Sequence, residues 1–152
     1  MISSLSFVFP IRRSVQVNIS SPAGSYASSS PPFFHYVVRL NEADITLLPD
    51  EEEALAMLGA IPHAYCDDSF CEGPGWRVLP ACFCEDWPVL ETEPQRLRKA
   101  LEVARSVMWR HAATVGITAR EILTVDEEID KVLQVVEQAE SAGFNINMTY
   151  VS

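Results

Sequence analysis

The second half of the chain contains two stretches in which apolar residues recur at the spacing of an α-helix, and these stretches constrain the fold most strongly. Residues 93–115 and 125–142 each show this spacing, and glycines follow directly at Gly116 and Gly143. Spacings of three and four residues place side chains on one face of a helix, and a glycine after such a run is typical of a helix end. The sequence therefore predicts two long amphipathic helices.

Residue pairs that resemble helix-capping boxes stand before both stretches. Thr92 with Gln95 precedes the first helix, and Thr124 with Glu127 precedes the second. In such a box the threonine side chain accepts a hydrogen bond from the backbone three residues later. The connection between the two helices is short, so we expect them to be antiparallel neighbours.

Two shorter helical segments are also predicted. A further pair, Thr118 with Glu121, is expected to cap a single turn between the long helices. Earlier in the chain, Asp50 can cap a short helix that Gly59 would end. The apolar side of this short helix is formed by Leu55, Met57 and Leu58.

The remaining regular segments show the alternation, or the β-branched and aromatic content, of strands. The predicted strands are residues 5–9, 15–19, 33–40, 76–84 and 144–151. The Ser/Pro-rich residues 20–32 are expected to form a loop or linker. Residues 1–152 are therefore interpreted as a single α+β domain: a mostly antiparallel sheet of about five strands with two long amphipathic helices packed on one face.

Charge restricts the classes of partner. The formal net charge is -10, from 21 acidic and 11 basic residues. Such a surface repels phosphate backbones and anionic lipids, so we expect no direct nucleic-acid binding. No apolar run reaches the roughly 18 residues of a membrane-spanning helix, so no membrane segment is expected.

The acidic residues are not evenly distributed. Residues 42–53 contain six of them, whereas residues 93–115 are rich in arginine. One interpretation is that these arginines pair with the acidic helix beside them. The other is that the protein directs an acidic surface at a basic partner, which would speed their encounter.

The sequence favours a non-enzymatic acidic interaction protein. It would bind a basic protein partner, in the manner of an inhibitor, immunity protein or chaperone, or it would self-associate as an oligomer. The candidate partner-binding residues are Asp50, Glu51, Glu52, Glu53, Trp76 and Trp87.

A segment rich in cysteine suggests a first alternative, a zinc-stabilised binding module. The candidate ligands are His63, Cys66, Cys71, Cys82 and Cys84. Four soft ligands can close a tetrahedral zinc site, but the Cys-x-Cys spacing at residues 82–84 departs from the usual paired knuckles. Buried reduced thiols and disulfides remain the other two interpretations, and no cofactor other than zinc is suggested.

A small hydrolase or transferase that depends on Cys or His is the second alternative. The only histidines that could serve as a base are His35, His63 and His111. The thiol of Cys84 is followed by two carboxylates, which disfavour the reactive thiolate. With six glycines in the chain, neither the dinucleotide fingerprint nor the Walker pattern can be written. We therefore expect neither of these two types of nucleotide enzyme. The sequence favours a non-enzymatic protein and leaves the Cys- or His-dependent enzyme as an open alternative.

The N-terminal composition bears on location. Residues 1–41 contain no acidic residue, and residues 1–32 are rich in serine, which is typical of an organelle transit peptide. Residues 14–19, in contrast, alternate like a half-buried strand. We expect a cytoplasmic protein, with a transit peptide as the alternative.

Overall fold

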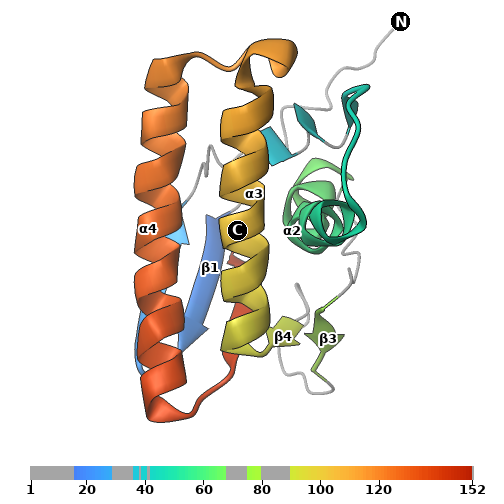
Figure 1. Ribbon diagram of the computed structural model, residues 1–152. Helices are drawn as coiled ribbons and strands as arrows, with labels where there is room; N and C mark the ends of the chain where they lie inside the picture. The colour runs from blue at the N-terminus through green and yellow to red at the C-terminus, as the bar shows by residue number, and fades with distance from the viewer. Residues whose placement is uncertain are drawn as a thin grey trace, which may run out of the picture.

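A computed structural model describes residues 16–28, 36–37, 39–40, 42–67, 75–79 and 90–151 (Figure 1). For residues 16–17, 28, 59–67, 78 and 149–151 it describes the backbone path alone. An antiparallel sheet carries the strand order β2-β1-β5-β4-β3. Its strands are β1 (Gln16–Ser21), β2 (Gly24–Ser28), β3 (Arg77–Val78), β4 (Leu90–Thr92) and β5 (Ile146–Val151). The helices are α2 (Pro49–Asp67), α3 (Pro94–Val115) and α4 (Ala119–Ala142).

The predicted α+β class is confirmed. Figure 1 shows α3 and α4 lying side by side over one face of the sheet, with α2 on the other flank of α3. A three-residue connection joins α3 to α4, which therefore run antiparallel as expected. Among the helices that the structure describes, none is long and apolar enough to span a membrane.

Three of the predicted strands are found at least in part. The segment 15–19 corresponds to β1, 144–151 to β5, and 76–84 to the short strand β3. The predicted strand 5–9 lies outside the described residues. Strand β4, which pairs with both β3 and β5, was not predicted, because its three residues are too few to show an alternating pattern.

The prediction of a strand at residues 33–40 is wrong where the structure describes it. Tyr36, Val37, Arg39 and Leu40 are helical, and so is Glu42. Val37 and Leu40 are buried, whereas Arg39 is exposed, which is the three-residue spacing of one helical turn. Strand propensity depends strongly on context, and here packing against the core overrides it.

The prediction of a loop or linker at residues 20–32 is wrong for residues 20–28. Ser21 pairs with Gly24 across a two-residue turn, and β2 then runs antiparallel to β1. In the turn, the Ser21 hydroxyl accepts a hydrogen bond from the Ala23 amide at 3.1 Å. The small polar residues that resemble a linker therefore form a hairpin.

The long helices are confirmed, but their first residues differ from the predictions. Thr92 belongs to β4, and its hydroxyl is buried without a hydrogen-bond partner; the N-cap of α3 is Glu93, which makes no side-chain cap. The N-cap of α4 is Thr118, whose box with Glu121 is complete, so the helix starts six residues earlier than expected. Both helices end at a glycine in the left-handed conformation, as predicted.

Helix α2 is longer than expected and is capped differently. It continues through Gly59 to Asp67, and Asp50 lies inside its first turn. The Leu48 carbonyl accepts hydrogen bonds from the amides of Glu51 and Glu52 at 3.0 and 2.9 Å, so Leu48 is the residue that precedes the helix. The predicted apolar side is confirmed, since Leu55, Met57 and Leu58 are all buried.

The core lies between the sheet and the three helices. Its side chains come from every layer: Ile19, Leu90, Ile146 and Met148 from the sheet, Leu55 and Leu58 from α2, Leu97, Leu101 and Met108 from α3, and Ile122, Ile129, Val132 and Val136 from α4. The buried faces of α3 and α4 match the apolar stripes in the sequence. This packing leaves one side of α2 and α3 turned to solvent.

Candidate functional site

Arginines of α3 pair with the acidic helix beside it, as one of the two interpretations of the charge pattern predicts. Arg105 reaches the Asp130 carboxylate at 2.6 Å (Nη2 to Oδ1) and lies 3.5 Å from Asp126 (Nε to Oδ1). Arg98 pairs with Glu140. Exposed pairs of this kind contribute little to stability, but they neutralise charge locally.

Other carboxylates of α4 are also engaged within the protein. The Tyr26 hydroxyl donates to Glu128, which is buried, at 2.6 Å, and the Tyr36 hydroxyl donates to Glu121 at 2.6 Å. The Trp109 indole N–H donates to Asp126 at 3.0 Å. Much of the negative charge of α4 is therefore directed at groups within the fold.

The acidic segment at residues 42–53 differs, because most of its carboxylates face solvent. Its exposed acidic residues are Glu42, Asp44, Asp50, Glu52 and Glu53. Within the described part of the chain, none of the five forms an ion pair or a side-chain hydrogen bond. Arg39 shares a hollow with Glu42 and Asp44, yet its guanidinium lies over the Tyr36 ring, 5.4 Å from the centroid.

Glu51, the sixth acid of this segment, has a structural role. Its side chain is 6% exposed; Oε1 accepts from the Leu48 amide at 2.9 Å, and Oε2 accepts from Arg110 at 2.6 Å. The backbone hydrogen bond, followed by the Arg110 guanidinium, lowers the pKa of Glu51 below its ordinary value. Glu51 therefore joins the start of α2 to α3 and is not available to a partner.

Leu48 adds an apolar side chain among the exposed acids. It is 60% exposed, although its neighbour Leu47 packs against the core. Its backbone groups are held by the first turn of α2, which fixes its position directly before the acidic residues of that helix. An exposed apolar side chain within an acidic segment is compatible with a protein interface, which has a dehydrated centre and a polar rim.

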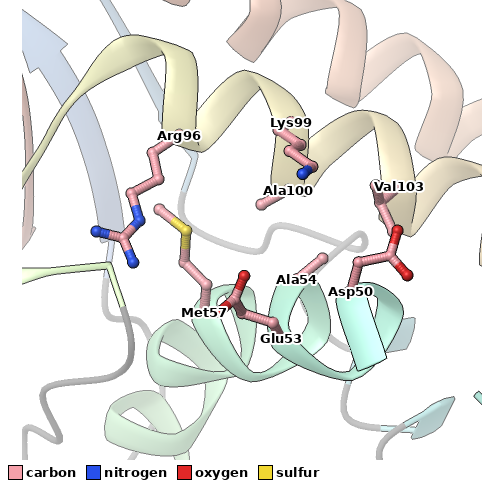
Figure 2. A pocket seen from close by; sticks show the side chains of 8 residues that line it. All are labelled: Asp50, Glu53, Ala54, Met57, Arg96, Lys99, Ala100 and Val103. Atoms are coloured by element: carbon pink, nitrogen blue, oxygen red, sulfur yellow. The ribbon is translucent and has the colours of Figure 1, made fainter. Parts of the chain in front are cut away.

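A groove runs between α2 and α3, and Figure 2 shows the side chains that line it. Asp50 and Glu53 project from α2, and Arg96 and Lys99 project from α3 on the opposite side. The apolar residues between them are Ala54, Met57, Ala100 and Val103. The four charged side chains are exposed, and none of them is in an ion pair with a residue that the structure describes.

Trp76, which the sequence suggested for partner binding, lies in the core. It is 4% exposed, and its indole N–H donates to the Met57 carbonyl at 3.0 Å. A large aromatic ring gains more from burial beside α2 than an exposed position would allow, provided that its polar N–H is satisfied. Trp76 therefore offers almost no surface to a partner. Trp87 lies outside the described residues.

The zinc and enzyme alternatives involve residues that the structure describes only in part. His63 and Cys66 belong to the last two turns of α2, whereas Cys71, Cys82 and Cys84 lie outside the described residues. The described residues contain no group of three or more side chains suited to a metal ion. His111 is half-buried on α3, and its Nε2 has no hydrogen-bond partner. Both alternatives stay predictions.

Sequence reasoning missed Arg96, Lys99 and Leu48 as candidate functional residues. The signal for the two cations was present, because their three-residue spacing places them on one face of a helix. That face becomes a groove only because α2 packs beside it. Comparison of the chain with protein-family models, with curated proteins and with solved structures gives no match.

Proposed function

We propose that this protein is a non-enzymatic interaction protein that binds a basic protein partner through its acidic segment, residues 42–53. The observation that carries the proposal is the group of exposed carboxylates there that lack an ion pair within the described residues. Acids on α4, in contrast, are engaged by arginines and tyrosines of the same chain. Carboxylates without internal partners are free to attract an external cation.

The overall charge supports the same proposal. A net charge of -10 produces a field that attracts a basic surface from a distance and raises its rate of association. The acidic segment would then fix the orientation of the bound partner, and Leu48 would supply an apolar contact at its centre. A cytoplasmic location forms part of this proposal, and cell fractionation tests it.

A matched pair of charge variants tests which acids are used. The first variant combines Glu42→Gln, Asp44→Asn and Glu52→Gln, and the control variant combines Glu102→Gln, Glu127→Gln and Glu137→Gln. All six side chains are exposed, and each variant removes three negative charges. The probe is a lysine- and arginine-rich peptide whose association is followed by stopped-flow fluorescence at low and moderate salt.

We expect the first variant to associate about tenfold more slowly at low salt, while the control loses much less, because steering depends on where the charge lies. Raising the ionic strength should reduce the difference, since the Debye length falls to about 8 Å at 0.15 M salt. Equal slowing in both variants would mean that net charge alone attracts the peptide, and the proposal would then be wrong. A protein captured from cells that has no basic surface would also contradict it.

A further inference from the structure

The groove between α2 and α3 has opposite charges on its two sides. In Figure 2 the acids Asp50 and Glu53 extend from α2, and the bases Arg96 and Lys99 extend from α3. Figure 1 shows α2 nearly end-on beside the upright α3, so the two helices cross at the groove rather than run alongside each other. The groove therefore has one negative and one positive edge.

Among the residues that the structure describes, these four side chains have no ion-pair partner, although other charges on the same helices are paired. On α3, Arg98, Arg105 and Arg110 all form ion pairs with neighbouring elements, whereas Arg96 and Lys99 form none with the described residues. The acids and bases face each other across Met57 and Ala100 without closing the gap. An external surface that brought a base to the α2 edge and an acid to the α3 edge would satisfy all four.

We propose that this external surface is a second copy of the same chain, seated groove to groove. In a twofold dimer each patch meets its own copy, so residue i contacts j and j contacts i. A twofold axis that runs along the groove and lies in the interface places the acidic edge of each copy over the basic edge of the other. Asp50 and Glu53 of one copy then face Arg96 and Lys99 of its partner, and this complementarity occurs twice.

A twofold axis across the groove would instead place the acidic edge of one copy over the acidic edge of the other. The charges of the groove therefore select one arrangement and disfavour the other, which is how charge specifies register in an interface. The apolar residues between the edges, Ala54, Met57, Ala100 and Val103, would form the dehydrated centre.

The size of the face sets the expected strength of the dimer. The residues that line the groove span 50–57 of α2 and 96–103 of α3, about two turns or roughly 12 Å of each helix, so the face is small. A standard stable interface buries about 800 Å² on each partner. The net charge of -10 on each copy also opposes association. We therefore expect a reversible dimer that forms best at moderate salt, where long-range repulsion is screened.

Reversing each edge separately provides the test. One variant carries Asp50→Lys and Glu53→Lys, and the other carries Arg96→Glu and Lys99→Glu. Sedimentation velocity over a wide range of concentration should show a monomer–dimer equilibrium for the full chain and dimerisation weakened about tenfold or more in each variant. An equimolar mixture of the two variants should dimerise again, because each reversed edge now meets its complement.

Restoration in the mixture excludes misfolding and net charge as explanations. A misfolded variant would not recover on mixing, and the Asp50→Lys, Glu53→Lys variant has a net charge closer to zero than the wild type. A chain that carries all four reversals should dimerise like the wild type. A wild-type chain that stays monomeric, single-edge variants that still dimerise, or a mixture that stays monomeric would each overturn the proposal.

This proposal shares Asp50 and Glu53 with the acidic segment, but it can be tested separately from the binding of a basic partner. It uses Asp50 and Glu53, whereas the peptide experiment changes Glu42, Asp44 and Glu52, which do not line the groove. If dimerisation fails while the peptide still distinguishes the two neutralised variants, only the second-copy proposal is wrong. The reverse result would leave the dimer and remove the basic partner.

Discussion

Replacing Thr118 with alanine tests where helix α4 begins. Two threonines in this region stand three residues before a glutamate, Thr118 before Glu121 and Thr124 before Glu127. The hydroxyl of Thr118 accepts a hydrogen bond from the Glu121 amide at 3.2 Å, and the Glu121 carboxylate accepts one from the Thr118 amide at 2.9 Å. Thr124 lies inside the helix, and its hydroxyl donates to the Arg120 carbonyl at 3.3 Å.

The two alanine variants should therefore affect stability in opposite directions. Loss of an N-cap threonine costs about 1 kcal/mol of unfolding free energy, because an amide of the first turn loses its acceptor. Alanine in place of the exposed Thr124 should instead gain about 0.5 kcal/mol, because alanine has the higher helix propensity. The difference between the variants is then about 1.5 kcal/mol.

Urea unfolding followed by circular dichroism measures this difference directly. In a thermal scan, about 1 kcal/mol corresponds to a change in Tm of roughly 2 to 4 °C for a domain of this size. Thr118→Ala should lower the Tm by that amount, and Thr124→Ala should leave it unchanged or slightly raised. If Thr124→Ala is the more destabilising change, the helix begins after Thr124 and the placement of its first turn is wrong.

Two further predictions concern a glycine and a titrating pair. Gly75→Ala should destabilise the protein more than Gly143→Ala. Both glycines have positive φ, 89° and 78°, where a side chain costs about 1 kcal/mol, but only at Gly75 would the added Cβ meet a described neighbour, the Met57 sulfur at 2.8 Å. Equal losses of stability in urea unfolding would contradict this. The backbone hydrogen bond from Thr118 and then the Tyr36 hydroxyl lower the pKa of Glu121 below 4.5, while burial and then Glu121 raise the pKa of Tyr36 above 10.0. Their contribution to stability should therefore be lost as the pH falls below 4.5 and as it rises above 10.0, and Tyr36→Phe should remove the alkaline loss; an unchanged alkaline loss would contradict this.

Some elements could be identified from the sequence because their evidence is local. Helices α3 and α4 each span six or more turns with a continuous apolar stripe, and a glycine follows each. Strand β5 alternates cleanly, so one face had to be buried. In these segments the spacing of the apolar residues matches the repeat of the helix or strand that they form, so tertiary packing and local preference favour the same structure.

Part of the candidate site was also visible in the sequence. The density of acids at residues 42–53 is a property of composition, and it marked this segment before any contact was known. The different roles of the acids within this segment were not visible in the sequence. Glu51 turns inward only because Arg110 and the Leu48 amide meet it there, while Asp50 and Glu53 turn toward the groove. Adjacent residues of one type thus acquire different roles from their neighbours in space.

Tertiary structure decided the features in which local preference and packing disagree. Tyr36, Val37, Arg39 and Leu40 favour a strand by residue type, yet they are helical because Val37 and Leu40 both reach the core from one side. Pairing with β1 turns the Ser/Pro-rich segment into a hairpin. The groove itself needs α2 beside α3, since its two charged edges come from residues more than forty positions apart. Sequence periodicity determines which face of a helix is buried, but only packing determines what lies opposite the exposed face.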